Sequence, residues 1–195
     1  MVTIVDYDTG NIRSVQNAFK RIGADFRMSG DPEEIMRAER LFLPGVGEMT
    51  TAMAKLRERG LVDAIKSVKV PVLGICLGMQ IMCSYGEEGG RIEGMGIFDN
   101  VVSHMRGDSV HKVPHVGWNG ITGLRSPLFE GIEEGAYVYY VHSFAANVNE
   151  NTIATTVHGS PFSGSLARGN FYGCQFHPEK SGPVGDRILS NFLKL

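Results

Sequence analysis

The chain has 195 residues, of which 43% are hydrophobic and 21% charged, and its formal net charge is −2. These values are typical of one compact globular domain over residues 1–195, and the lack of a basic block argues against nucleic-acid binding through bulk electrostatics. Three cysteines are too few for a disulfide framework, and we find neither a signal peptide nor a membrane-spanning apolar run, so we expect a cytoplasmic protein without a membrane partner.

The first half of the chain alternates strand-like and helix-like patterns. Short apolar runs predict strands at residues 2–7, 24–28, 40–45 and 70–75, and helical periodicity predicts helices at 11–23, 32–38, 48–60, 61–66 and 77–86. Such alternation implies an α/β fold with a mostly parallel sheet flanked by helices. In such sheets, ligands bind at the carboxyl ends of the strands.

After about residue 95 the pattern changes to strands separated by turn residues. We expect strands at 96–102, 136–144, 152–159, 162–169 and 170–177, followed by a final helix from Val184 to Leu193. These strands are either antiparallel additions to the main sheet or a small side sheet, and the sequence leaves both possibilities open.

The segment "GICLG", from Gly74 to Gly78, places a cysteine between a predicted strand and a predicted helix. This is the cysteine version of a nucleophile elbow, in which small flanking residues let strand and helix approach. The N-terminus of the following helix would favour the thiolate of Cys76, and the N–H of Leu77 is a natural oxyanion donor. A packed structural cysteine beside coincidental glycines is the competing interpretation.

A thiolate that transfers acyl groups needs a base and a group that orients the base. The segment "QFHPEKS" offers both, because Pro178 favours an extended conformation at His177. In an extended segment, residues two apart share a face, so His177 and Glu179 are predicted to contact each other. Taken alone, this segment could equally be a surface turn; together with the elbow it predicts a Cys76–His177–Glu179 triad.

The segment "PGVG", Pro44 to Gly47, ends the third predicted strand at the same edge as the elbow. We expect the N–H of Val46 to be the second oxyanion donor. Because Gly45 has unusual conformational freedom, the Gly45–Val46 peptide could present either its N–H or its carbonyl. We expect the carbonyl to face the pocket in the resting protein. A simple strand-to-helix turn is the alternative.

Together, "PGVG", "GICLGMQ" and "HPEKS" resemble the motifs of the class I (triad) glutamine amidotransferases. Within that family, "DYDTGNIRSV", "PHVGWN" and "YYVHSF" are similar to segments of the glutaminase subunits of imidazole glycerol phosphate synthases. The resemblance covers nearly the whole chain and implies a flavodoxin-like fold. Two positions depart from it: Val116 stands where methionine is frequent, and Phe144 where tyrosine is frequent.

The resemblance implies a mechanism without cofactor or metal. Cys76 would attack the side-chain amide of L-glutamine, His177 would activate the thiol and protonate the departing ammonia, and Glu179 would orient His177. Water would then cleave the thioester to release glutamate. By motif position, the glutamine pocket is expected to be lined by Gly47, Gln80, Glu88, His142, Ser143 and Phe144.

The resemblance also implies a partner, a (β/α)8-barrel cyclase of histidine biosynthesis that receives the ammonia in a heterodimer. The residues expected toward this partner are Pro114, Trp118, Asn119 and Tyr139. Core packing of Trp118 is the competing interpretation of that residue.

Two other functions are compatible with parts of this sequence. The first is a triad glutaminase that serves another ammonia-accepting synthase, and "YYVHS" and "PHVGWN" argue against it. The second is a non-catalytic binding module with this fold, and the complete triad argues against that. The cysteine at the elbow excludes a thiol-independent α/β hydrolase.

Overall fold

The computed structural model describes residues 1–8 and 12–195, so Asn11, where the first helix was predicted to begin, lies outside the described residues. The main sheet has seven strands in the order β11-β12-β13-β4-β3-β1-β2. Five are mutually parallel: β1 (Val2–Val5), β2 (Phe26–Ser29), β3 (Leu41–Leu43), β4 (Val72–Ile75) and β13 (Phe171–Cys174). The antiparallel strands β11 (Thr152–His158) and β12 (Ser160–Arg168) extend the sheet at one edge.

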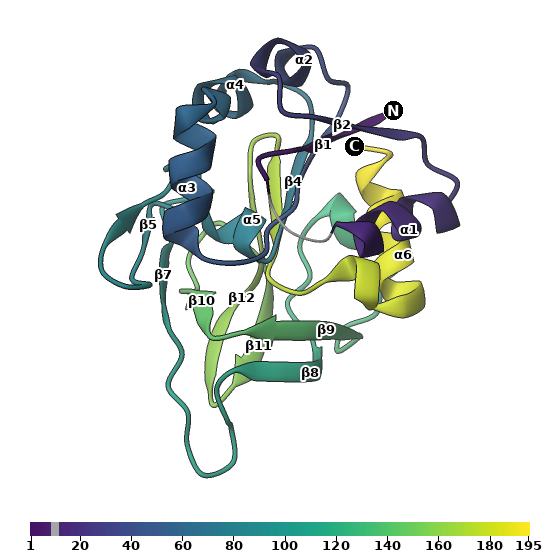
Figure 1. Ribbon diagram of the computed structural model, residues 1–195. Helices are drawn as coiled ribbons and strands as arrows, with labels where there is room; N and C mark the ends of the chain where they lie inside the picture. The colour runs from purple at the N-terminus through teal and green to yellow at the C-terminus, as the bar shows by residue number, and fades with distance from the viewer. Residues whose placement is uncertain (9–11) are drawn as a thin grey trace.

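Helices cover both faces of this sheet (Figure 1). On one face lie α1 (Arg13–Arg21) and α6 (Gly182–Phe192). On the other lie α2 (Pro32–Met36), α3 (Met49–Glu58), α4 (Leu61–Ser67) and α5 (Leu77–Gln80). The predicted α/β fold with a mostly parallel sheet is confirmed. None of the helices among the described residues has the length and apolar character that a membrane crossing requires.

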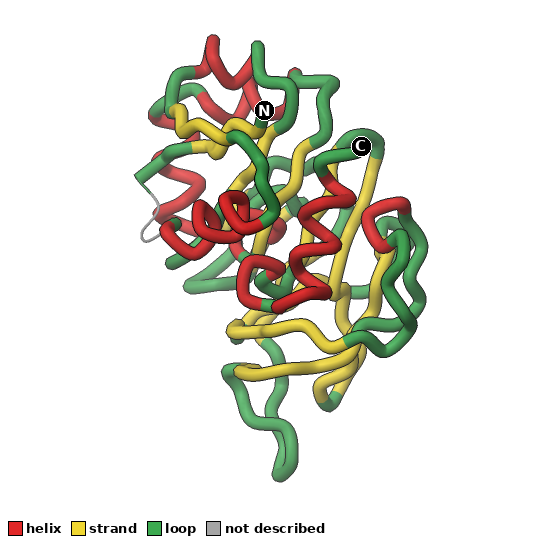
Figure 2. Tube along the Cα trace, turned by 90° about the vertical axis from the view of Figure 1, so that its right-hand side faces the viewer, coloured by secondary structure: helices red, strands yellow, loops and turns green. Residues whose placement is uncertain are grey.

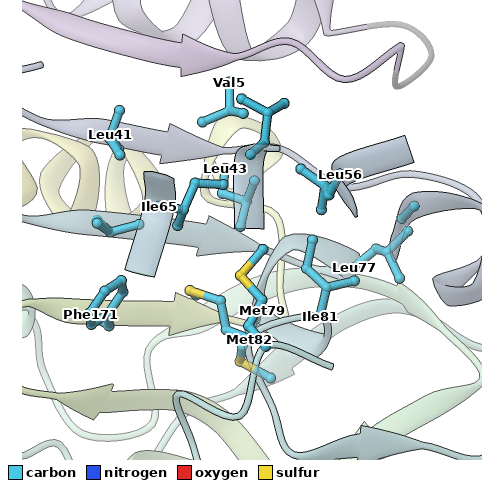
Figure 3. Packing of buried hydrophobic residues seen from close by; sticks show 14 of the residues in the cluster. Val5, Leu41, Leu43, Leu56, Ile65, Leu77, Met79, Ile81, Met82 and Phe171 are labelled. Atoms are coloured by element: carbon cyan, nitrogen blue, oxygen red, sulfur yellow. The ribbon is translucent and has the colours of Figure 1, made fainter. Parts of the chain in front are cut away.

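The two faces of the sheet carry separate apolar clusters. Figure 3 shows the cluster under α3, α4 and α5, where Leu41 and Leu43 of β3 pack with Leu56 and Ile65 of the helices. On the opposite face, Phe19 of α1 packs edge-on against Phe42, with ring centroids 5.2 Å apart. Alternate residues of β3 therefore point into different clusters, as expected for a strand buried on both sides.

Two smaller sheets lie outside the main one (Figure 2). One has four strands in the order β10-β7-β5-β6, formed by β5 (Tyr85–Gly86), β6 (Ile92–Glu93), β7 (Val101–His104) and β10 (Phe144–Ala146). The other pairs β8 (His115–Gly120) with β9 (Tyr137–His142) and is called the β8–β9 ribbon below. Added strands and side sheets therefore both occur. Two short 3₁₀ turns complete the elements, η1 (Pro127–Phe129) and η2 (Pro178–Lys180).

Several predicted elements are shorter than the sequence suggested, and the strand predicted at 136–144 is divided between β9 and β10. The helix predicted at 77–86 ends at Gln80, because the following carbonyls accept main-chain hydrogen bonds from a distant segment instead. The Met95 N–H donates to Ile81 and the Gly96 N–H to Cys83, at 2.7 and 3.0 Å. Cys83, which falls inside the helix predicted at 77–86, therefore lies beyond the end of α5. The strand predicted at 96–102 begins only at Val101.

Candidate active site

Three neighbouring parallel strands bring the predicted motifs to one edge of the main sheet. Cys76 follows β4, the segment from Pro44 to Gly47 follows β3, and His177 lies three residues beyond the end of β13. Since β13, β4 and β3 are adjacent and parallel, their carboxyl ends meet at the same edge. Strand order thus assembles segments that are up to 133 positions apart in the sequence (177 − 44).

The elbow has the backbone strain expected of a nucleophile position. Cys76 has φ 53° and ψ −113°, a backbone conformation that residues other than glycine rarely adopt. The glycines around it are required by close approach. A Cβ at Gly78 would lie 2.0 Å from the Leu43 carbonyl oxygen, and one at Gly74 would lie 2.5 Å from the Gly78 carbonyl oxygen. The prediction that small residues let the strand and the helix approach is confirmed.

The oxyanion segment is also held against the elbow. A Cβ at Gly45 would lie 2.0 Å from the Gly78 nitrogen. Gly45 does not have a positive φ, so glycine is needed here for this close approach and not for an unusual backbone conformation. The left-handed residue of this segment is Gly47, at φ 97°. Val46 and Leu77 both line the pocket next to Cys76. Which way their N–H groups act on a substrate oxygen stays a prediction.

His177 and Glu179 contact each other as predicted, but through a different backbone. His177 Nδ1 lies 2.8 Å from Glu179 Oε1, and both side chains are almost completely buried. His177 itself is extended, whereas Glu179 lies in the 3₁₀ turn η2, so the pair is not formed along a continuous extended segment. Ser181 Oγ donates to the His177 carbonyl and fixes the turn.

The electrostatics of this pair favour a protonated imidazole. The pKa of His177 is raised to about 9: burial alone would lower it, but Cys76 and Glu179 outweigh the burial. Its Nε2 atom is buried and has no hydrogen-bond partner among the described residues, which leaves it available for the reacting groups. Such an arrangement suits a thiolate–imidazolium pair with a carboxylate behind the imidazole.

The three cysteines occupy different environments. Cys76 is partly exposed at the pocket, whereas Cys83 and Cys174 are fully buried. Burial raises the pKa of the Cys83 thiol strongly and that of Cys174 to about 12. Since the thiolate is the reactive form, Cys83 and Cys174 are suited to packing only.

Cys76 opens into a cavity of about 410 Å³, within the range usual for small-molecule sites. Its walls contain all of the residues predicted to bind glutamine, namely Gly47, Gln80, Glu88, His142, Ser143 and Phe144. Glu88 also accepts a 3.0 Å hydrogen bond from the Met49 N–H at the start of α3. Pro114, Val141 and Lys180 line the cavity too, so the pocket reaches the β8–β9 ribbon.

Two contacts at this site were missed by sequence reasoning. The Tyr7 hydroxyl donates to the Pro44 carbonyl at 2.6 Å, and burial raises the pKa of this phenol. The Gln175 Nε2 atom lies 3.7 Å from the Cys76 sulfur and donates toward it. Both residues stand inside the quoted segments "DYDTGNIRSV" and "QFHPEKS", but no local pattern indicated where their side chains point.

The residues predicted toward a partner divide between the two faces of the β8–β9 ribbon. Trp118 and Tyr139 are a cross-strand pair with ring centroids 6.0 Å apart, and Trp118 is 54% exposed, so it is not a core residue. Asn119 alternates with Trp118, and its side chain instead donates to the Val157 carbonyl at 2.9 Å. Pro114 lies where the ribbon borders the pocket.

The chain is similar to known proteins over its whole length. The family model "Glutamine amidotransferase class-I" matches residues 3–195. Imidazole glycerol phosphate synthase subunit HisH of Bacteroides fragilis is 47% identical over 195 residues, covering 100% of this chain and 99% of that protein. The subunit HisH of Escherichia coli K12 is 46% identical over 197 residues, with coverage of 100% and 99%.

Solved structures show the same fold at lower sequence identity. A crystal structure of a glutamine amidotransferase superimposes with a TM-score of 0.75 at 19% identity, covering 100% of this chain and 98% of that one. The structure of PurLQS from Thermotoga maritima gives a TM-score of 0.68 at 19% identity, with coverage of 99% and 97%.

Proposed function

The chain belongs to the class I glutamine amidotransferase family, and from this premise we propose that it is the glutaminase subunit of an imidazole glycerol phosphate synthase in histidine biosynthesis. The observation that carries the proposal is that Cys76 and His177 line the same 410 Å³ pocket, while Glu179 lies behind His177 with its Oε1 atom 2.8 Å from Nδ1. The full-length similarity to HisH subunits supports the choice of synthase.

In the proposed reaction the Cys76 thiolate attacks the carboxamide carbon of L-glutamine. The N–H groups of Leu77 and Val46 stabilise the oxyanion, and protonated His177 gives its proton to the departing ammonia. The resulting thioester is cleaved by a water molecule that His177 deprotonates, which releases glutamate and restores the Cys76 thiolate and protonated His177. Glu179 holds the imidazole through Nδ1, so Nε2 exchanges the proton.

The proposed partner is the cyclase subunit that uses the ammonia, bound on the outer face of the β8–β9 ribbon. This face carries the exposed side chains of Val116, Trp118 and Tyr137. Aromatic residues of this kind are enriched at protein–protein interfaces. Because the ribbon also borders the glutamine pocket, ammonia formed there would leave close to the partner.

The test combines the purified chain with a candidate cyclase subunit. We expect co-purification as a heterodimer, low glutamine hydrolysis by the chain alone, and stimulation by the cyclase with its ligand bound. Side-chain amide ¹⁵N from labelled glutamine should appear in imidazole glycerol phosphate. Transfer of the label only with a different synthase would overturn the choice of partner, and no hydrolysis with any synthase would overturn the enzyme assignment.

A further inference from the structure

Gln175 makes an unusual contact for a fully buried amide. Its Nε2 group lies 3.7 Å from the Cys76 sulfur, and its Oε1 atom accepts a 2.9 Å hydrogen bond from Gln80. The Oε1 contact fixes the orientation of the amide, because Gln80 contributes its Nε2 donor there. The N–H groups of Gln175 therefore point toward the sulfur.

Gln80 is in turn fixed by the main chain of the pocket wall. Its Nε2 group also donates to the Phe144 carbonyl at 2.9 Å. The same carbonyl lies 2.9 Å from His142 Nδ1. A carbonyl oxygen can only accept, and it has two lone pairs, so both neighbours must be donors. His142 therefore carries a proton on Nδ1.

The hydrogen-bond direction continues unambiguously to β8. In neutral His142, Nε2 is an acceptor, so His115 Nδ1, 3.0 Å away, is the donor. His115 Nε2 then accepts from Asn119 Nδ2 at 3.3 Å. The Asn119 amide is itself oriented by two main-chain groups, since its Nδ2 donates to Val157 and its Oδ1 accepts from the Gly120 N–H.

The environment keeps both imidazoles neutral. Burial lowers the pKa of His142 to about 4 and that of His115 to about 3, and neighbouring histidines add to the effect. His115 is also stacked between Tyr140 and His158, with centroid distances of 4.8 and 4.1 Å. Both rings are thus fixed in position and in tautomer.

We propose that Gln175 donates a hydrogen bond to the Cys76 thiolate, and that Asn119, His115 and His142 are positioning residues that hold this donor through the Phe144 carbonyl and Gln80. Because α5 has only four residues, its dipole is a weaker source of thiolate stabilisation than the predicted longer helix would be. A directed side-chain donor supplies stabilisation that the short helix does not. The inference rests on the proposed function only for the role of Cys76 as nucleophile.

The first test measures the alkylation rate of Cys76 by iodoacetamide against pH in the full-length chain, without glutamine or partner. In Gln175→Met we expect the midpoint of the profile to rise by about one pH unit, with roughly tenfold slower alkylation below the midpoint. Gln16→Met is the matched control, because the Gln16 amide also contacts a sulfur, Met28 Sδ at 3.2 Å, but on the surface. An unchanged midpoint in folded Gln175→Met would overturn the proposal.

Other ionisable groups near the sulfur must stay constant in this comparison. They are His177 and Tyr7, which interact electrostatically with Cys76, and the pocket residues Glu88, His142 and Lys180. None is changed in either variant. A midpoint that moves equally in Gln175→Met and Gln16→Met would count against the proposal.

The second test reads the chain of positioning residues. His115→Phe keeps a stacked ring but removes the donor to His142, so we expect a smaller rise of the midpoint. His115→Gln keeps one donor and one acceptor, so the midpoint of the alkylation profile should return to that of the unsubstituted protein. In the unsubstituted protein, ¹⁵N NMR of the imidazoles should show His115 and His142 both protonated at Nδ1; Nε2 protonation of either ring would overturn the relay. This spectrum decides even if a variant does not fold.

These readouts separate the inference from the proposed function. Absent glutamine hydrolysis together with the expected alkylation shift would refute the function and leave the hydrogen-bond chain standing. Normal hydrolysis together with an unshifted alkylation profile would refute the hydrogen-bond chain and leave the proposed function standing.

Discussion

The proposed catalytic edge of the main sheet, which carries Cys76, His177 and Glu179, differs from the β8–β9 ribbon in how its side chains find partners. At the edge, His177 and Glu179 are buried and bound to each other, and their loop is tied down by Ser181. On the ribbon, Trp118 and Tyr137 are 54% and 62% exposed. The edge contains the groups for its chemistry, whereas the ribbon presents apolar surface that nothing in the described residues covers.

This contrast indicates that two regions close together in space have different roles, the edge in chemistry and the ribbon in association. The His177 N–H donates to the Tyr139 carbonyl at 2.9 Å, and the Tyr139 N–H donates to Ser181 Oγ at 3.0 Å. Strand β9 is therefore bonded directly to the turn that follows His177, the proposed base. Changes at the edge should act on chemistry, and changes on the ribbon should act on association.

The largest effect is expected from Cys76→Ala, which tests whether the edge alone carries the chemistry. Loss of the nucleophile should reduce glutamine hydrolysis by about 10⁴-fold or more, as for other triad enzymes. Binding to the cyclase should be unchanged, because Cys76 faces the pocket. Hydrolysis rates and isothermal titration with the cyclase measure the two halves of this prediction.

A glutamine analogue that alkylates thiols provides the control on the intact chain. It should label Cys76 and leave the buried Cys83 and Cys174 unmodified. Similar labelling rates at either buried cysteine would contradict the assignment.

Glu179→Gln is expected to have the next largest effect, a loss of about 10³–10⁴-fold in kcat, because the amide disturbs the orientation and tautomer of His177.

The same variant should also change how the stability of the folded protein depends on pH. The raised pKa of His177, about 9, stabilises the folded protein fully below pH ~6.5, and this contribution is lost as pH rises toward 9. Urea unfolding across this window should show a smaller decline in Glu179→Gln; an equal decline would contradict the role of Glu179.

Much of the catalytic edge could be predicted from the sequence because its determinants are local. Gly74 closely approaches the Gly78 carbonyl, a contact within five residues, and Pro178 marks the turn beside His177. What failed depends on distant partners: the helix after Cys76 stops early because main-chain donors of Met95 and Gly96 take its carbonyls. No periodicity within 77–86 contains that information.

The same limit applies to the polar contacts behind the site. Gln175 and Cys76 are 99 positions apart, and Tyr7 and Pro44 are 37 apart. A residue type can suggest a donor, but only strand order decides which acceptor it meets. The exposure of Trp118 was likewise open in the sequence, because an aromatic residue in an alternating strand suits either a core or an interface.

Gly45→Ala sharpens the role of the oxyanion segment at the edge. A Cβ there would lie 2.0 Å from the Gly78 nitrogen, so the segment must move away from the elbow. If one oxyanion donor is lost, cyclase-stimulated hydrolysis should fall by about 10²–10³-fold while the KM for glutamine changes little. The ratio of cyclase-stimulated to basal activity should also change.

Gly123→Ala is the control for this prediction, because Gly123 has φ 67° and open space around its Cα. It should cost stability without affecting kcat. A Gly45→Ala variant that retains full cyclase-stimulated hydrolysis would contradict the placement of an oxyanion donor in this segment.

On the ribbon, Trp118→Ala should weaken cyclase binding by about 30-fold or more, as expected when a central aromatic anchor is removed. Basal hydrolysis and the unfolding midpoint should stay close to those of the unsubstituted chain, since the side chain is exposed. Val148→Ala, at another exposed apolar position, should leave binding unchanged. Equal affinity of the Trp118→Ala protein for the cyclase would break the proposed contrast between edge and ribbon.

The last effect concerns stability against pH at His142, which lies between the two regions. Because burial lowers its pKa to about 4, the folded protein resists protonation that the unfolded chain accepts near pH 6.5. The stability contribution is therefore present above pH ~6.5 and is lost as pH falls toward 4, on the order of 2–3 kcal/mol in total. Urea unfolding between pH 7 and 4 should show this decline, and it should be shallower in His142→Gln, which has no imidazole to protonate. The nearby exposed His104 is the control, because His104→Gln should keep the full slope. If all three proteins lose the same stability between pH 7 and 4, His142 is not kept neutral by burial. The hydrogen bonds assigned to its neutral ring, which link the pocket wall to the ribbon, would then be contradicted.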